Sequence, residues 1–127
     1  MKPISTKEAP QAIGPYSQGI LLKVGHNTLY TSGQIALDPV SGEMVQGGIE
    51  AETRRVLANL DAILKEAGMG KANVVKTTVF LKDLGEFQAM NAIYEAFFEG
   101  HKPARSTVEV SNLPRSARIE IEAIAAL

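Results

Sequence analysis

The sequence of this chain predicts an α+β fold in which two helices cover one face of a five-stranded sheet. Two segments, 48–68 and 87–100, repeat apolar residues with the spacing of a helix. Three others, 74–81, 104–110 and 118–126, carry the β-branched residues typical of strands. A chain of 127 residues is long enough to bury its own core, so we expect one domain spanning 1–127.

The N-terminal part is expected to form an ordered loop followed by a β-hairpin. Two prolines and a glycine mark the loop at 10–18. Apolar residues at 19–24 and 28–32 predict two strands, and a Gly-His-Asn turn at 25–27 would connect them. The run Asp-Pro-Val-Ser-Gly at 38–42 predicts a further turn.

Both predicted helices have boundary signals. Gly68 is a C-terminal stop for the first helix, and Gly100 closes the second. Before the second helix, Asp83 as N-cap and Glu86 at the third helical position resemble a capping box. The apolar stripes consist of Val56, Leu60, Ile63, Leu64 and Ala67 on the first helix and Phe87, Met90, Tyr94, Phe97 and Phe98 on the second.

Several predicted strands are apolar on both faces, most clearly residues 74–81. Two helices leave the second face of the sheet uncovered, and monomers rarely expose large contiguous apolar patches. The patch argument therefore favours an oligomer. The alternative is that the hairpin and the long loops fold over the second face.

Composition excludes several classes of function. The formal net charge is −1 and 21% of residues are charged, which gives no electrostatic case for binding nucleic acid or an anionic membrane. The absence of cysteine excludes disulfides and thiolate chemistry. Residues 1–8 lack the apolar core of a signal peptide, and no apolar run approaches the roughly 20 residues that cross a bilayer. We expect a soluble cytoplasmic protein.

Metal, triad and nucleotide chemistry find little support in the sequence. The histidines, His26 and His101, have no metal-ligand spacing and are better explained as solvated surface side chains. No serine elbow supports a serine–histidine–carboxylate triad. Dinucleotide-binding and phosphate-binding glycine loops are absent from the sequence. We therefore expect neither a metal nor a cofactor.

The most informative polar residue is Arg105, in a predicted strand. A guanidinium keeps its charge in a protein, so an arginine on a half-buried strand needs an anionic partner. Strand alternation places Arg105 on one face with Thr107 and Glu109. One interpretation is a cross-strand ion pair of Arg105 with Glu109 or Glu122. The other is a clamp for the carboxylate of a ligand, and the pattern alone leaves both open.

Tyr16, Ser32, Phe87 and Asn91 are ambiguous when each is taken alone. A loop tyrosine, a hydroxyl at a strand end, a core phenylalanine and an exposed helix amide are all common structural features.

Taken together, six blocks of sequence resemble the RidA proteins, the reactive intermediate deaminases. The resemblance implies a chorismate-mutase-like fold, with a mixed sheet packed by two helices. It further implies a homotrimer with a central β-barrel and clefts between subunits. The blocks are residues 12–19, 31–35, 75–84, 91–98, 103–106 and 119–125.

The activity implied by the resemblance is hydrolysis of 2-imino acids, such as 2-iminopropanoate and 2-iminobutanoate, to 2-oxo acids and ammonia. Arg105 would bind the substrate carboxylate as a bidentate fork, and Glu120 would hold the attacking water. The cleft would be lined by Tyr16, Ser32, Gly33, Phe87, Asn91 and Thr107.

Thr107 departs from the family pattern, because many members carry a cysteine there. Water can hydrolyse an electrophilic imine without a covalent intermediate, so Thr107 is compatible with activity. The resemblance also includes proteins linked to control of purine synthesis and proteins described as stress chaperones. The alternative functions are therefore a carboxylate-binding regulator or a chaperone, neither with turnover.

Overall fold

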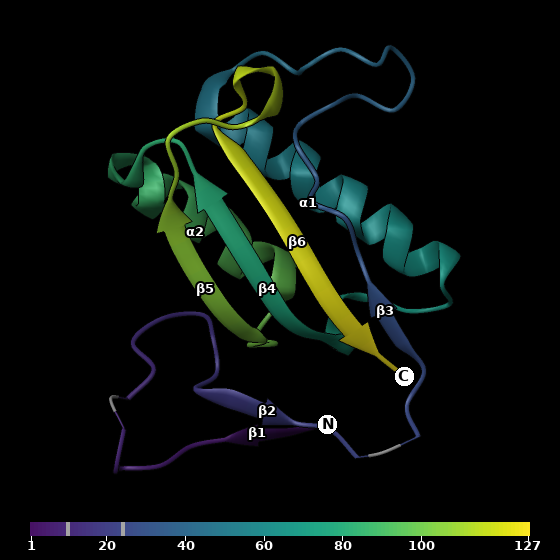
Figure 1. The fold of residues 1–127 in the computed structure, drawn as a ribbon, viewed down its shortest axis with the longest axis vertical. Coiled ribbons are helices and arrows are strands. Elements are labelled where there is room, and N and C mark those ends of the chain that lie inside the picture. The colour runs from purple at the N-terminus through teal and green to yellow at the C-terminus, as the bar shows by residue number, and fades with distance from the viewer. Residues whose placement is uncertain (10, 24) are drawn as a thin grey trace.

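The computed structural model describes residues 1–9, 11–23 and 25–127 and arranges them mainly in two layers (Figure 1). One layer is a four-stranded sheet with the order β3-β6-β4-β5, and two helices, α1 and α2, lie behind it. β1 and β2 form a separate small sheet beside one end of the main sheet. The elements are β1 Lys2–Ile4, β2 Gly19–Leu21, β3 Thr28–Tyr30, α1 Gly48–Glu66, β4 Val74–Leu81, α2 Phe87–Phe98, β5 Ala104–Glu109 and β6 Ile119–Ala126.

The main sheet is mixed, which confirms the α+β prediction with two helices. β4 runs parallel to β5 and antiparallel to β6, and β3 pairs antiparallel with the outer side of β6. On the helix-covered face, alternate residues of the two central strands are buried. They include Thr77, Val79 and Leu81 of β4 and Ile119, Ile121, Ala123 and Ala125 of β6.

The helices pack on the sheet through most of their predicted apolar stripes, although Ile63 is only half-buried and Ala67 lies exposed after the end of α1. α1 buries Val56, Leu57, Leu60 and Leu64, and α2 buries Met90, Tyr94 and Phe98. Full burial of each large apolar side chain stabilises the fold by about 1.5–3 kcal/mol. Gly68 adopts a φ of 72° just after α1, which confirms the predicted stop. No helix in the described ranges is long and apolar enough to span a membrane.

The predicted hairpin between residues 19–24 and 28–32 is wrong. β2 pairs with β1 at the N-terminus, whereas β3 pairs with β6 at the other end of the chain. The physical reason is that β6 offers β3 a long apolar partner inside the main sheet. The sheet consequently has four strands rather than five. Pro10 and Val24 of the predicted loop and strand lie outside the described residues.

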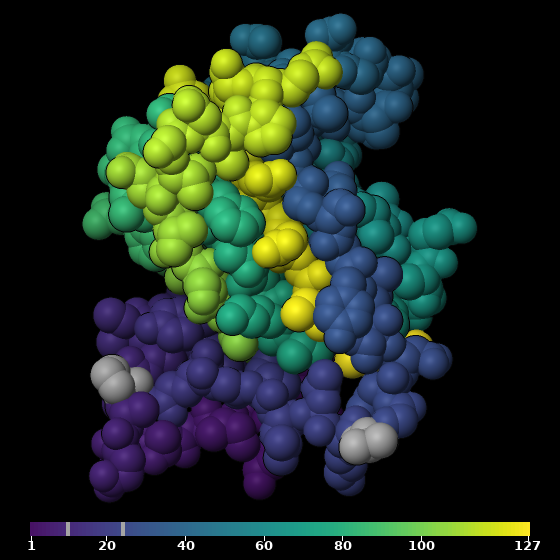
Figure 2. All heavy atoms as spheres, in the orientation of Figure 1, coloured from purple at the N-terminus to yellow at the C-terminus, as the bar shows by residue number. Residues whose placement is uncertain are grey.

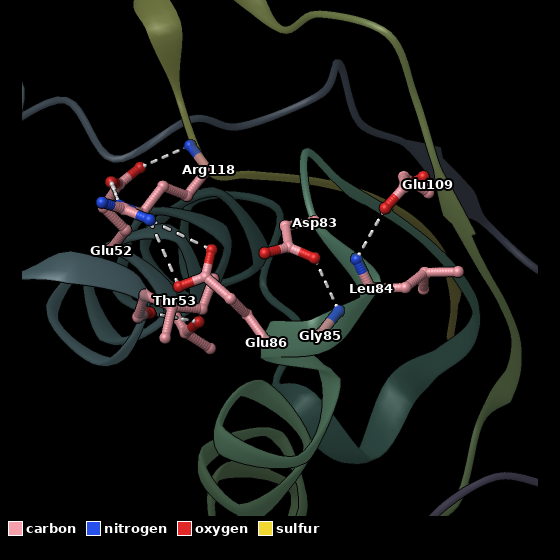
Figure 3. Close-up of polar contacts among 9 residues, drawn as sticks. Glu52, Thr53, Asp83, Leu84, Gly85, Glu86, Glu109 and Arg118 are labelled. Carbon is pink, nitrogen blue, oxygen red and sulfur yellow. Dashed lines mark hydrogen bonds and ion pairs between the residues drawn. The ribbon is translucent and has the colours of Figure 1, made fainter.

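The predicted capping box forms only in part. Asp83 Oδ1 accepts a hydrogen bond of 2.8 Å from the Gly85 amide, and this caps a short 3₁₀ turn, Leu84–Glu86, in front of α2 (Figure 3). The Glu86 carboxylate does not complete the box. It accepts hydrogen bonds of 3.2 and 3.3 Å from Arg118 Nη1.

Arg118 connects three elements at one end of the molecule (Figure 3). Glu52 of α1 is buried, and its Oε1 accepts a hydrogen bond of 3.0 Å from the Arg118 amide. The Arg118 guanidinium lies 3.8 Å from Glu52 Oε2 and also pairs with Glu86. The second turn of α1, the approach to α2 and the start of β6 are thereby fixed to one another.

The second face of the main sheet carries no helix, and Figures 1 and 2 view it from the front. In Figure 2 the side chains of β4 and β6 are visible between those of β5 and those of the segment leading to α1. Tyr30 is 73% exposed and Val108 is 42% exposed. Phe80 and Ile124 remain half-buried there. The expectation that residues 74–81 are apolar on both faces is wrong, because Lys76 and Thr78 share this second face with Phe80, opposite Ile124, Glu122 and Glu120 of β6. The loops leave much of this mixed face uncovered.

Replacing Arg118 by methionine is expected to lower the free energy of unfolding by about 1–3 kcal/mol, because the buried Glu52 carboxylate loses its cation. Urea denaturation at fixed protein concentration measures the change. Glu52→Gln keeps an acceptor for the Arg118 amide and removes the buried charge, so it should lower the free energy of unfolding by a smaller amount. A variant Arg118→Met as stable as the parent would show that the network contributes nothing.

Candidate functional site

Arg105 lies on β5, an edge strand of the main sheet, and its side chain is on the helix-covered face. Its Cα partner on β4 is Thr77, which is buried against α2. The side chain of Arg105 is only half-buried. The strand thus places a permanent positive charge between the sheet and the second helix, within reach of solvent.

Three aromatic rings surround the Arg105 guanidinium. Its Cζ lies 4.8 Å from the ring centroid of Tyr94, 5.4 Å from that of Tyr16 and 5.5 Å from that of Phe87. Nη1 donates a hydrogen bond of 2.7 Å to Asn91 Oδ1. We call Arg105 and these four residues the arginine cluster.

The arginine cluster holds its charge with neutral partners only. Burial lowers the pKa of Arg105, and the neighbouring Tyr94 and Tyr16 oppose that shift. The guanidinium still keeps its proton at neutral pH. Ring faces and an amide oxygen attract a cation more weakly than a carboxylate does. A small anion would therefore gain more from Arg105 than its present partners do.

The cross-strand ion pair is wrong. β4 separates β5 from β6, and the register places Glu120 opposite Phe80 and Glu122 opposite Thr78, on the uncovered face. Glu109 shares the face of Arg105, but its Oε1 accepts a hydrogen bond of 2.9 Å from the Leu84 amide (Figure 3). None of the ion pairs in the described part of the chain includes Arg105.

Helix α2 supplies three members of the arginine cluster from one face. Phe87, Asn91 and Tyr94 are spaced i, i+4 and i+7, so they line up along the helix. Tyr94 was missed as a site residue because it belongs equally to the apolar stripe. Its spacing from Asn91 and Phe87 was the available signal.

The loop at 11–18 places Tyr16 over the guanidinium. The Ser17 amide donates a hydrogen bond of 3.0 Å to the Pro103 carbonyl, and the Ser17 hydroxyl donates to the Lys102 carbonyl. These bonds attach the loop to the start of β5. A Cβ on Gly14 would lie 3.3 Å from the Tyr16 ring, which leaves little room for a larger residue.

A hollow of about 400 Å³ adjoins the arginine cluster. Gly14 and Asn91, which border Arg105, are part of its wall. The other lining residues are Ala12, Ile13, Pro15, Glu95 and Lys102. Solvent therefore reaches the neighbourhood of the guanidinium between the loop and α2.

Thr107 lies two residues beyond Arg105 on the same face of β5. Its Oγ1 is buried and has no hydrogen-bond partner among the described residues. A buried hydroxyl without a partner costs free energy, so a ligand or a water molecule would stabilise it.

Glu120 and Gly33 form a second group on the uncovered face, which we call the glutamate cluster, and Ser32 adjoins it as the neighbour of Gly33 in the chain. Backbone hydrogen bonds between Gln34 and Ile121, of 2.8 and 3.1 Å, carry the segment after β3 alongside β6. A Cβ on Gly33 would lie 2.5 Å from Glu120 Oε1, so glycine is required for the carboxylate to lie where it does.

The predicted site residues thus fall into two separate groups. Tyr16, Phe87, Asn91 and Arg105 meet in the arginine cluster, with Thr107 on the same strand face. Gly33 and Glu120 meet in the glutamate cluster, and Ser32 precedes Gly33 along the chain. Within one chain the sheet separates the two, so Glu120 does not face Arg105.

The histidines contribute to neither cluster. His101 was expected on the surface, but it is half-buried and its Nε2 donates a hydrogen bond of 2.7 Å to the Val74 carbonyl. Among residues 1–9, 11–23 and 25–127, no three His, Asp or Glu side chains are grouped as metal ligands are.

Comparison with known proteins identifies the family. A family model described as endoribonuclease L-PSP matches residues 6–127. The chain belongs to this family. Rat 2-iminobutanoate/2-iminopropanoate deaminase is 52% identical over 124 residues, which cover 98% of this chain and 88% of the relative. The human protein of the same name is 50% identical over 122 residues, covering 96% and 87%. The resemblance to the RidA deaminases is therefore confirmed.

Solved structures of this family share the fold. The E. coli YjgF gene product is 49% identical, with a TM-score of 0.75 and coverage of 99% of this chain and 98% of the other. E. coli TdcF, solved with bound serine, is 41% identical, with a TM-score of 0.76 and coverage of 100% and 99%.

Replacing Asn91 by aspartate would give Arg105 an anionic partner within the chain, at the present hydrogen-bond distance of 2.7 Å. We expect this variant to bind 2-oxobutanoate at least about tenfold more weakly than the parent, since the guanidinium charge is then already neutralised. Isothermal titration calorimetry measures the affinity. Asn91→Ala adds no charge and should lose much less affinity. An equal loss of affinity in both variants would contradict neutralisation of the guanidinium as the cause.

Proposed function

We propose that this protein hydrolyses 2-imino acids, such as 2-iminobutanoate and 2-iminopropanoate, to the 2-oxo acid and ammonia. The observation that carries the proposal is Arg105, a half-buried cation held by one amide oxygen and three rings. Relatives of about 50% identity that are named as deaminases of these two substrates support it.

In the proposed reaction Arg105 binds the substrate carboxylate. A guanidinium presents two parallel N–H donors that match the two carboxylate oxygens, which fixes the adjacent imine carbon. The serine bound to TdcF also carries a carboxylate, which is consistent with this role. Holding the reacting atom in place lowers the entropic part of the barrier.

Glu120 is proposed to handle the water and the protons. Its carboxylate accepts a proton as the water oxygen bonds to the imine carbon, and the electron pair of the C=N bond moves to nitrogen. The proton is then delivered to nitrogen. The hydroxyl proton of the resulting carbinolamine then moves to the nitrogen through the Glu120 carboxylate, and the C–N bond breaks to release ammonia as the oxygen forms the C=O bond. Water is the only co-reactant, and acid–base assistance of this kind contributes about 10²–10⁴-fold.

The two clusters would meet in a homotrimer with a central β-barrel. β3 and β5 are the edges of the main sheet, and edge strands readily pair with another chain. The uncovered face, with Val108 and Tyr30 exposed, would line the barrel. The glutamate cluster of one copy would then complete the arginine cluster of the next. This arrangement explains why each chain carries both groups on opposite faces.

Thr107 is proposed to contact the substrate beside Arg105. Its hydroxyl is buried without a partner, and a ligand held by Arg105 would lie on the same strand face. Because water is the nucleophile, the absence of a thiol at this position is compatible with turnover.

Other functions find less support from the residues. A ribonuclease, as the family model's description suggests, must neutralise several phosphates, whereas this chain has a net charge of −1. A carboxylate-binding regulator or a chaperone would not need Glu120 beside Gly33.

The proposed reaction predicts faster loss of 2-iminobutanoate when the protein is added to a threonine dehydratase reaction, with the remaining imine trapped as semicarbazone. Arg105→Ala should lower kcat/KM at least about 100-fold, since both charge-assisted hydrogen bonds are lost. Arg105→Lys keeps the positive charge and loses the two parallel N–H donors, so its kcat/KM should lie between those of the parent and Arg105→Ala. No acceleration by the parent rules out the activity, and in that case binding of 2-oxobutanoate would favour the regulator.

A shared site predicts complementation between inactive variants. Arg105→Ala and Glu120→Gln proteins are unfolded together, refolded as mixed trimers and assayed. Random mixing gives an interface with both intact residues in about a quarter of cases, so about a quarter of the parent activity should return. Each variant refolded alone is the control. If the mixture is no more active than the controls, the two residues do not act across subunits.

A further inference from the structure

We propose that Tyr94 is a positioning residue. Its hydroxyl is fixed by Thr77, and its ring holds the Arg105 guanidinium in the position that binds a carboxylate. The inference rests on the proposed role of Arg105 and goes beyond it, because it states what holds the guanidinium in place.

Three contacts connect the residues in a closed arrangement. Thr77 of β4 and Arg105 of β5 are direct Cα partners, so their side chains leave the sheet next to each other on the same face. The Tyr94 hydroxyl is 2.7 Å from Thr77 Oγ1, and the Tyr94 ring centroid is 4.8 Å from Arg105 Cζ. The Tyr94 hydroxyl therefore hydrogen-bonds β4 while the Tyr94 ring contacts the positively charged Arg105 guanidinium on β5.

The burial of the pair makes the arrangement rigid. Tyr94 is 0% exposed and Thr77 is 1% exposed, so neither hydroxyl has water as an alternative partner. Burial raises the pKa of Tyr94 to about 12, against the opposing effects of the Thr77 hydrogen bond and the Arg105 charge. The hydroxyl is consequently protonated throughout the neutral range and remains able to hydrogen-bond Thr77.

The ring of Tyr94 differs from the other two rings of the arginine cluster. Its centroid is nearest to the guanidinium, and Tyr16 belongs to a loop whereas Tyr94 lies in the core between α2 and the sheet. Phe87, at the first residue of α2, has no hydroxyl to fix its plane. Of the three rings, Tyr94 is therefore the one that fixes the position of the guanidinium relative to the sheet, while Asn91 binds Nη1 from the helix.

The test compares Tyr94→Leu with Val56→Ala, which removes buried side-chain volume from the same core on α1, outside the arginine cluster. Phe98 is unsuitable as a control because its ring centroid lies 4.7 Å from that of Tyr94. For folded protein, verified by circular dichroism and gel filtration, Tyr94→Leu should weaken 2-oxobutanoate binding about 5- to 30-fold, the range expected for a desolvated cation–π contact. KM for 2-iminobutanoate should rise by a similar factor with kcat changed less than about threefold. Val56→Ala should lower thermal stability and leave the affinity and KM unchanged.

Milder variants keep the test decisive if Tyr94→Leu does not fold. Tyr94→Phe and Thr77→Val each remove the hydroxyl contact, and each should weaken binding by about 2- to 5-fold, with the double variant no weaker than either single one. Unchanged affinity in all Tyr94 variants, or an equal loss of affinity in Val56→Ala, overturns the positioning role. A parent protein that binds 2-oxobutanoate but does not hydrolyse the imine overturns the proposed function alone.

Discussion

The central interaction of the structure is the contact of the Arg105 guanidinium, a permanent positive charge on an edge strand, with neutral side chains instead of a carboxylate. Arg105 would be costly in this half-buried place if it lacked partners, and three rings with one amide oxygen stabilise it. All of these partners are neutral. The parallel pairing of β4 with β5 and the docking of α2 bring them together. The carboxylates nearest in sequence are engaged elsewhere, as Glu109 is with the Leu84 amide.

The same sheet also explains why a single chain holds only part of the proposed site. The register of β4 with its neighbours turns Arg105 toward the helices and Glu120 toward the uncovered face. The loop at 11–18 covers only the start of β5, where Ser17 bridges to Ala104. In the proposed assembly the rest of that edge, the β3 edge and much of the uncovered face would meet another copy. In the proposed trimer, assembly would bury apolar surface and complete the catalytic groups in one step.

Local patterns in the sequence were sufficient for α1, α2 and β4, because each has strong periodicity and clear ends. The strand pairing of β3 was not predictable in this way, since its partner β6 lies almost the whole chain away. Alternation placed Arg105 relative to Glu109, and Glu120 relative to Glu122, but only the register between strands shows that Arg105 and Glu120 point apart. Most site residues were recognised through motif resemblance. Tyr94 was not, because an aromatic residue on an apolar helix stripe has the same spacing in the sequence whether or not its ring contacts a cation.

The most direct test of the central claim is a crystal structure of the assembled protein with bound 2-oxobutanoate. The account predicts both carboxylate oxygens within hydrogen-bond distance, about 2.7–3.1 Å, of the Arg105 guanidinium, and the carbonyl carbon beside Glu120 of the adjacent copy. A ligand bound away from Arg105, or an Arg105 that pairs with a carboxylate of the protein in the assembly, would contradict it.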